Sequence, residues 1–93
     1  RAATATVTGV AASAASVALQ AANTNRLGLI VSNDSTSATL YVKLGTTATS
    51  ASGGYTESIL PGGAWEVPFN YTGRVDGIWD AATGFANVDE LAA

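Results

Sequence analysis

The 93-residue chain contains no cysteine, no histidine and no methionine. Without cysteine it can form neither a disulfide nor a thiolate metal site. Without histidine it lacks the most common general base and the most common metal ligand. We therefore expect a protein that is not an enzyme and that uses no metal or other cofactor.

Charged residues are also scarce. They make up 12% of the chain, about half of the share in an ordinary soluble domain. The four basic residues are Arg1, Arg26, Lys43 and Arg74; they are scattered, whereas a nucleic-acid partner requires clustered Lys and Arg. We expect no nucleic-acid binding, and a neutral surface of small side chains that is either solvated or packed against another protein.

Long apolar runs are absent too. No run approaches the roughly 18–20 residues of a membrane span, and the residues after Arg1 lack the apolar core of a signal peptide. We expect no membrane partner. A chain that begins at Arg1 rather than at methionine predicts a trimmed or internal start.

Along most of the chain, apolar and polar residues alternate with a period of two. Turn residues separate the alternating stretches at intervals of roughly 8–12 residues, which is typical of a sandwich or barrel. The pattern predicts an all-β fold, a small antiparallel β-sandwich or barrel of seven to eight short strands. The alanine-rich run Ala11–Ala15 is too short to stand as a helix and predicts a connection.

The N-terminal segment differs from the rest. Ala3, Ala5 and Val7 form one face and threonines form the other. If the alanine face points inward, the segment adds little to a core. We therefore predict an N-terminal arm or edge strand over residues 1–15, which pairs with a neighbouring molecule instead of serving its own core. The sandwich domain is predicted over residues 16–93.

In the later segments, the apolar residues that lie on one face of each strand predict the core. The residues expected to be buried are Leu29, Val31, Leu40, Val42, Trp65, Val67, Val75 and Trp79. The same alternation places Leu27 with Leu29, and Phe69 with Trp65.

Motifs for catalysis are missing. The sequence contains no phosphate-binding loop, zinc spacing or nucleophile elbow. Asp76 and Asp80 would have Cα atoms about 13 Å apart on one strand, whereas the carboxyl groups of glycosidases lie about 5–9.5 Å apart. We expect these two to be solvated carboxylates. Asn33–Ser35 is expected to cap a turn rather than to bind calcium.

The aromatic residues allow two interpretations. Tyr41, Trp65, Tyr71 and Trp79 could form a platform that stacks on a sugar, or the two tryptophans could fill the core, which their alternation with aliphatic residues favours. Tyr and Arg are enriched among interface hot spots. The candidate interface residues are therefore the outward Tyr41 and Tyr71, together with Arg74.

Five segments in a fixed order carry a family resemblance: SND, LYVKLG, LPGGAWEVP, YTGRVDGIW and ATGFANVDE. With them, the chain from about Val17 to Leu91 resembles a small β-domain of virion structural proteins of tailed bacteriophages. Decoration (cement) proteins and head-fibre or tail-associated modules contain this domain.

The resemblance implies a β-sandwich without enzymatic activity that assembles on a viral particle, often as a homotrimer. The first expectation is a capsid decoration protein on the outer surface of the virion, which binds and stabilises the lattice of the major capsid protein. The alternative is a carbohydrate- or receptor-binding module of a phage head or tail fibre.

Overall fold

The computed structural model describes residues 1–93 as eight β-strands without a helix, which confirms the all-β prediction. The strands are β1 (Thr4–Ala11), β2 (Val17–Gln20), β3 (Arg26–Asn33), β4 (Leu40–Leu44), β5 (Glu57–Ile59), β6 (Ala64–Val67), β7 (Val75–Trp79) and β8 (Phe85–Ala92). Residues 12–16 connect β1 to β2 without regular structure, which confirms the predicted connection except at Ala11, the last residue of β1. Gly62 and Gly84 adopt positive φ angles of 80° and 90° in the β5–β6 and β7–β8 turns, where a side chain would be strained.

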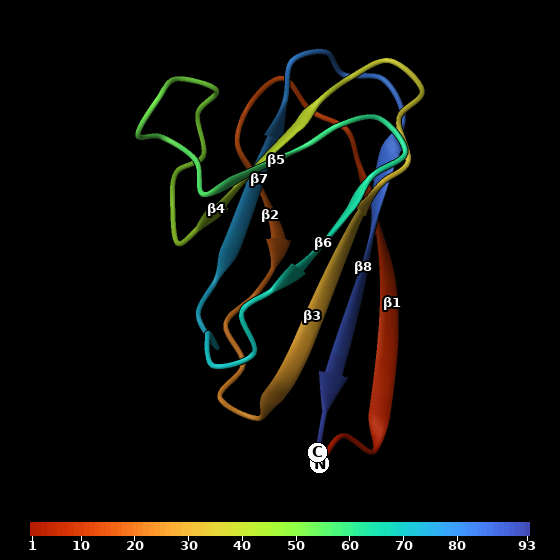
Figure 1. Cartoon of the computed structure of the whole chain (residues 1–93), viewed down its shortest axis with the longest axis vertical. Helices are drawn as coiled ribbons and strands as arrows, with labels where there is room; N and C mark the ends of the chain where they lie inside the picture. The colour runs from red at the N-terminus through yellow and green to blue at the C-terminus, as the bar shows by residue number, and fades with distance from the viewer.

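The strands form two four-stranded antiparallel sheets that face each other (Figure 1). Sheet A has the order β1-β8-β3-β6, and sheet B has the order β2-β7-β4-β5. Every connection except β4–β5 carries the chain from one sheet to the other. Of the two predicted alternatives, the fold is therefore the sandwich.

The facing surfaces of the sheets enclose a core of 12 buried hydrophobic residues. They are Leu19, Leu29, Val31, Ala38, Leu40, Val42, Ile59, Val67, Val75, Trp79, Ala86 and Val88. The predicted core residues all belong to it except Trp65, which is only partly buried. Trp65 lies on β6, an edge strand of four residues, so the sheet covers its ring from one side only.

One polar side chain joins the two sheets within this core. Asn33 at the end of β3 is fully buried, and its Oδ1 accepts a hydrogen bond from Trp79 Nε1 of β7 at 3.2 Å. Its Nδ2 donates to the carbonyl oxygens of Ala38 and Ile59, both at 2.9 Å. Oδ1 also accepts from the Ser35 N–H, which confirms the predicted turn cap. A fully satisfied buried amide of this kind fixes the relative position of the elements that it joins.

The N-terminal segment is an edge strand of its own chain. Strand β1 pairs with β8 over its whole length, from Thr4 opposite Ala92 to Ala11 opposite Phe85. The predicted assignment of its faces is wrong: Thr8 lies opposite the buried Val88, so the threonines are on the core side. Nearly all of β1 is nevertheless exposed, because it lies at the edge of sheet A away from sheet B (Figure 1).

Two further expectations about the core are wrong. Leu27 is 39% exposed and Phe69 is 76% exposed. The register between β3 and β8 shifts between Arg26 and Gly28, and this irregularity breaks the alternation at Leu27. Phe69 lies beyond β6, where Tyr71 N–H donates to the Pro68 carbonyl oxygen and the chain turns out of the sheet.

Candidate docking surface

The outer face of sheet B collects most of the predicted interface residues. In the β4–β7 pairing, Tyr41 lies opposite Ile78 and Lys43 lies opposite Asp76, whereas the intervening Val42 is buried in the core. Residues opposite each other in a pair share one face of the sheet. We define the sheet-B face by the residues Tyr41, Lys43, Tyr55, Arg74, Asp76 and Ile78.

Two tyrosine rings form an ordered pair on this face. The ring centroids of Tyr41 and Tyr55 lie 4.9 Å apart with an interplanar angle of 64°, an edge-to-face arrangement. Both residues are partly exposed. Such pairs add about 0.5–1.5 kcal/mol beyond the burial of their area. The pair therefore favours one arrangement of the two rings in the free protein, and the sequence did not indicate Tyr55 as a partner of Tyr41.

Asp76 is buried, so the prediction that it is a solvated carboxylate is wrong. Asp76 is 2% exposed, and both of its carboxylate oxygens accept hydrogen bonds. Arg74 Nε donates to Asp76 Oδ1 at 2.7 Å, and Ser16 Oγ donates to Asp76 Oδ2 at 3.3 Å. Ser16 Oγ also accepts the N–H of the buried Ala48, which fastens the 46–54 loop to this face.

Asp80 has a different environment. It is exposed, as predicted, and its Oδ1 accepts the Thr39 N–H at 3.0 Å. The two carboxylates therefore bind separate partners, and each has a structural contact of its own. Their arrangement provides no pair of carboxyl groups around a common site.

Arg74 remains accessible to a binding partner on the sheet-B face. Its side chain is 50% exposed although its Nε is held by Asp76. The ion pair thus fixes the Nε of a guanidinium that stays half exposed. Its interface role stays a prediction, and the buried carboxylate beneath it is a partner that the sequence did not indicate.

Tyr71 has a structural contact in addition to its place at the surface. Its hydroxyl donates to the Arg74 carbonyl oxygen at 2.7 Å, and its ring packs over Gly73 and against the edge of the core. A Cβ on Gly73 would lie 2.5 Å from the Tyr71 hydroxyl oxygen. The structure thus brings Tyr71 to Arg74, just before the start of β7, while Tyr41 lies further along the sheet-B face.

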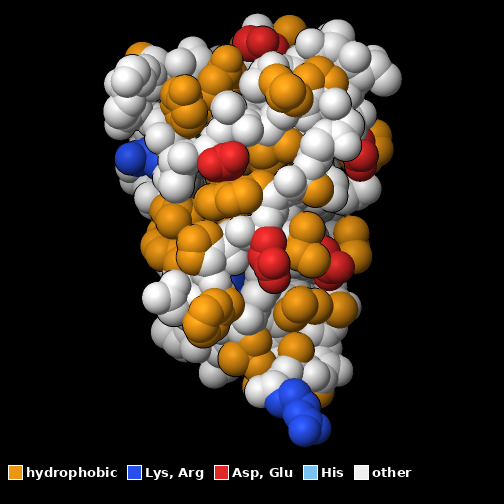
Figure 2. Space-filling model, in the orientation of Figure 1, with side chains coloured by type: hydrophobic (Ala, Val, Ile, Leu, Met, Phe, Trp, Pro, Cys, Tyr) orange, Lys and Arg blue, Asp and Glu red, His pale blue; other side chains and the backbone are white.

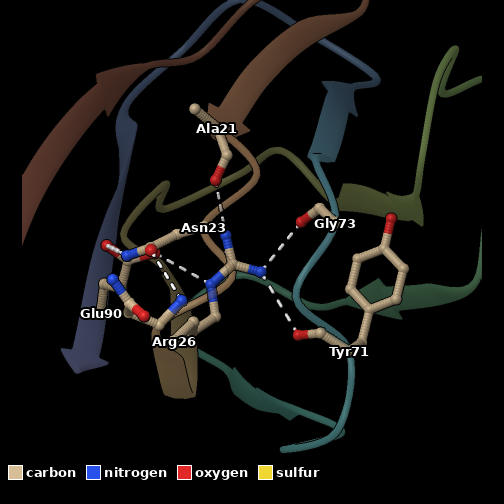
Figure 3. Close-up of polar contacts among 7 residues, drawn as sticks. Ala21, Asn23, Arg26, Tyr71, Gly73 and Glu90 are labelled. Carbon is tan, nitrogen blue, oxygen red and sulfur yellow. Dashed lines mark hydrogen bonds and ion pairs between the residues drawn. The ribbon is translucent and has the colours of Figure 1, made fainter. Parts of the chain in front are cut away.

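A buried arginine organises the adjoining loops, and the sequence analysis did not identify it (Figure 3). Arg26 is 3% exposed. Its Nε pairs with Glu90 Oε2 at 2.9 Å, Nη2 donates to the Ala21 carbonyl oxygen, and Nη1 donates to the carbonyl oxygens of Tyr71 and Gly73. Since a guanidinium presents five donors in a rigid fork, one side chain holds the β2–β3 and β6–β7 loops against β8.

The four aromatic residues considered as a sugar platform do not form one. Trp79 is 2% exposed within the core, and Trp65 is partly buried at the other sheet. The exposed phenylalanine rings are Phe69 at 76% and Phe85 at 46%. The most exposed aromatic rings are therefore those of the two phenylalanines rather than those of the tryptophans.

On the face shown in Figure 2, the acidic and basic side chains are mostly separated from one another by apolar and uncharged ones. On the outer face of sheet A, Asp89 lies between Val7 and Ile30. Asp89 Oδ1 is buried without a hydrogen-bond partner in the chain, an arrangement that costs about 1–3 kcal/mol.

The structure contains no pocket. It contains no cluster of three or more acidic, histidine or cysteine side chains with the arrangement of a metal site. None of its elements is a helix capable of crossing a membrane. Comparison with protein families, with curated proteins and with solved structures gives no match to this chain.

Proposed function

We propose that this protein is a non-enzymatic structural protein of a virion, a decoration protein that binds the outer surface of the capsid. In this role it would bridge subunits of the major capsid protein and stabilise their lattice. The proposal combines the resemblance carried by the segments between Val17 and Leu91 with the properties of the sheet-B face.

The observation that carries the proposal is that the exposed Tyr and Arg side chains of the sheet-B face already have partners within the chain. Tyr41 is held by Tyr55, and Arg74 is held by Asp76. Ordering a flexible side chain on binding costs about 0.5–1.5 kcal/mol, and contacts made within the free protein lower this cost for Tyr41 and Arg74. Tyr and Arg are also the residue types that dominate binding energy at protein interfaces.

A decoration protein would gain affinity by repetition. Each copy would contribute a limited contact, and a symmetric lattice would repeat this contact over the particle. Copies that engage several capsid subunits at once bind more tightly than any single contact allows. The small side chains that dominate the surface lose little rotamer entropy when they are covered.

The test compares intact particles with particles stripped of this protein. Stripped particles should release their genome at a lower temperature while still adsorbing to host cells. Adding back the protein should restore the release temperature, whereas the Tyr41→Ala variant should restore it less at equal concentration. Phe85→Ala is a matched control, because Phe85 is an exposed aromatic residue on sheet A rather than on the sheet-B face.

The second candidate function is the receptor- or carbohydrate-binding module of a head or tail fibre. The exposed rings of Phe69 and Phe85 favour it, because an aromatic face packs well on the C–H groups of a sugar. Stripped particles that keep their heat stability and fail to adsorb to cells would replace the decoration function with this one.

A further inference from the structure

Strand β1 differs from the other three sheet edges. Strand β2 has four residues and a register irregularity, β5 has three residues and begins with Glu57, and β6 has four residues, includes Glu66 and is followed by Pro68. Short length, charge, proline and bulges are the features by which proteins prevent strands from adding to an edge. Three of the four edges are therefore protected.

The β1 edge has none of these features. It has eight residues, with the sequence TATVTGVA, and contains neither charge nor proline. Its pairing with β8 runs from Thr4 to Ala11 without a shift in register. Side chains on both of its faces are exposed, so no other part of the chain covers its free edge. An edge of this kind is a template for a further strand.

The backbone groups that face outward can be assigned from the register. Ala12 N–H donates to the Gly84 carbonyl oxygen at 3.0 Å, which continues the β1–β8 ladder. Hydrogen-bonding residues alternate along an antiparallel strand. The even-numbered residues of β1 therefore bond to β8, and the N–H and C=O groups of Ala5, Val7, Gly9 and Ala11 point away from the sheet.

These outward groups are arranged for a copy of the same strand. An antiparallel pairing about a two-fold axis at Thr8 places Val7 opposite Gly9 of the second copy and Ala5 opposite Ala11 of the second copy. Every outward group from Ala5 to Ala11 then has a partner. The strand is uncharged, so no like charges meet, and the two Thr8 side chains form a favourable Thr–Thr pair.

We propose that the free edge of β1 binds the β1 edge of a second copy of this chain, so that the two A sheets join into one. This inference does not depend on the proposed function, because it concerns the isolated protein. One edge accepts only one strand, so the assembly is a dimer; the homotrimer that the resemblance implies would need another surface.

The test measures mass against concentration by analytical ultracentrifugation, from low micromolar to about one millimolar, because a single strand pair buries less than a standard interface. The mass should rise from the 9.3 kDa of one chain to twice that value. Val7→Pro removes an outward N–H and leaves the bonds to β8 intact, so it should weaken dimerisation more than tenfold. Val7→Thr retains the N–H and should dimerise like the unmodified chain.

Amide hydrogen exchange supplies a second measurement on the unmodified chain. At low concentration the amides of Thr6 and Thr8 should be protected, and those of Val7 and Gly9 should exchange rapidly. At high concentration the Val7 and Gly9 amides should become protected as well. A monomeric mass at all concentrations, a trimeric mass, or Val7 and Gly9 amides that stay unprotected in a dimer would each overturn the proposal.

Discussion

Replacing Asn33 by leucine should destabilise the protein far more than the small change in size suggests. Leucine has a similar volume, but it removes the partner of Trp79 Nε1–H, of Ser35 N–H and of the carbonyl oxygens of Ala38 and Ile59. An unsatisfied buried polar group costs about 1–3 kcal/mol, and burial of the apolar leucine side chain offsets only part of this loss. We expect a loss of about 3–5 kcal/mol from a free energy of unfolding of about 5–14 kcal/mol.

Urea denaturation followed by circular dichroism measures this loss. Asn87→Leu is the matched control, because Asn87 is partly exposed and its side chain donates one hydrogen bond, to Asp34 Oδ2; it should change the stability by less than about 1 kcal/mol. A loss below about 1 kcal/mol for Asn33→Leu would show that the hydrogen bonds of Asn33 contribute little to the stability of the core. A double-mutant cycle with Trp79→Phe should give a coupling energy of about 1 kcal/mol for the bond between the two sheets.

The remaining predictions concern three other positions, each measured by urea denaturation. Arg26→Met should lower the stability by about 3–5 kcal/mol, because it leaves the Glu90 carboxylate beside it without its ion-pair partner; a loss below about 1 kcal/mol would mean that the loops hold without the guanidinium. Gly77→Ala should cost about 1–3 kcal/mol, because the added Cβ would lie 2.8 Å from Leu19 Cδ1, and Leu19→Val should recover part of this loss; an unchanged stability would show that the core has room there. Asp89→Val should raise the stability by about 1 kcal/mol, because it removes a buried oxygen without a partner; a decrease would indicate that the carboxylate has a stabilising contact.

The strands and most of the core could be predicted from the sequence. Side chains on a strand alternate between its two faces, so a period of two in apolar residues indicates which face is buried. Leu40 and Val42 alternate with Tyr41 and Lys43, and the structure buries the first two and places the others on the sheet-B face. The rule failed where the chain departed from regular pairing. Leu27 lies at a register shift and Phe69 lies beyond the end of its strand, and neither departure is encoded by hydrophobicity.

The faces of β1 could not be predicted because its threonines and its alanines are both compatible with an exposed strand. What decides the assignment is the register against β8, where Thr8 lies opposite Val88. That pairing joins segments about 80 residues apart in the chain, and a single sequence carries no signal for it.

For the candidate docking surface, the sequence indicated which exposed residues to consider but not which side chains lie next to them. Arg74 and Tyr41 are exposed in part, as expected for interface residues. The partners that order them, Asp76 and Tyr55, could not be identified from the sequence, because a strand aspartate normally points to water and Tyr55 lies on a different segment. Arg26 and Glu90 form their ion pair across 64 residues, which again depends on the fold rather than on any local motif.

The claim that this protein decorates a capsid is tested most directly by its copy number in purified particles, measured by densitometry of a denaturing gel against the major capsid protein. A decoration protein binds a site that the lattice repeats, so we expect copies on the order of hundreds per particle, in a fixed ratio to the capsid subunits. A copy number comparable to that of the tail or fibre proteins would rule out the decoration function and assign the chain to those structures instead.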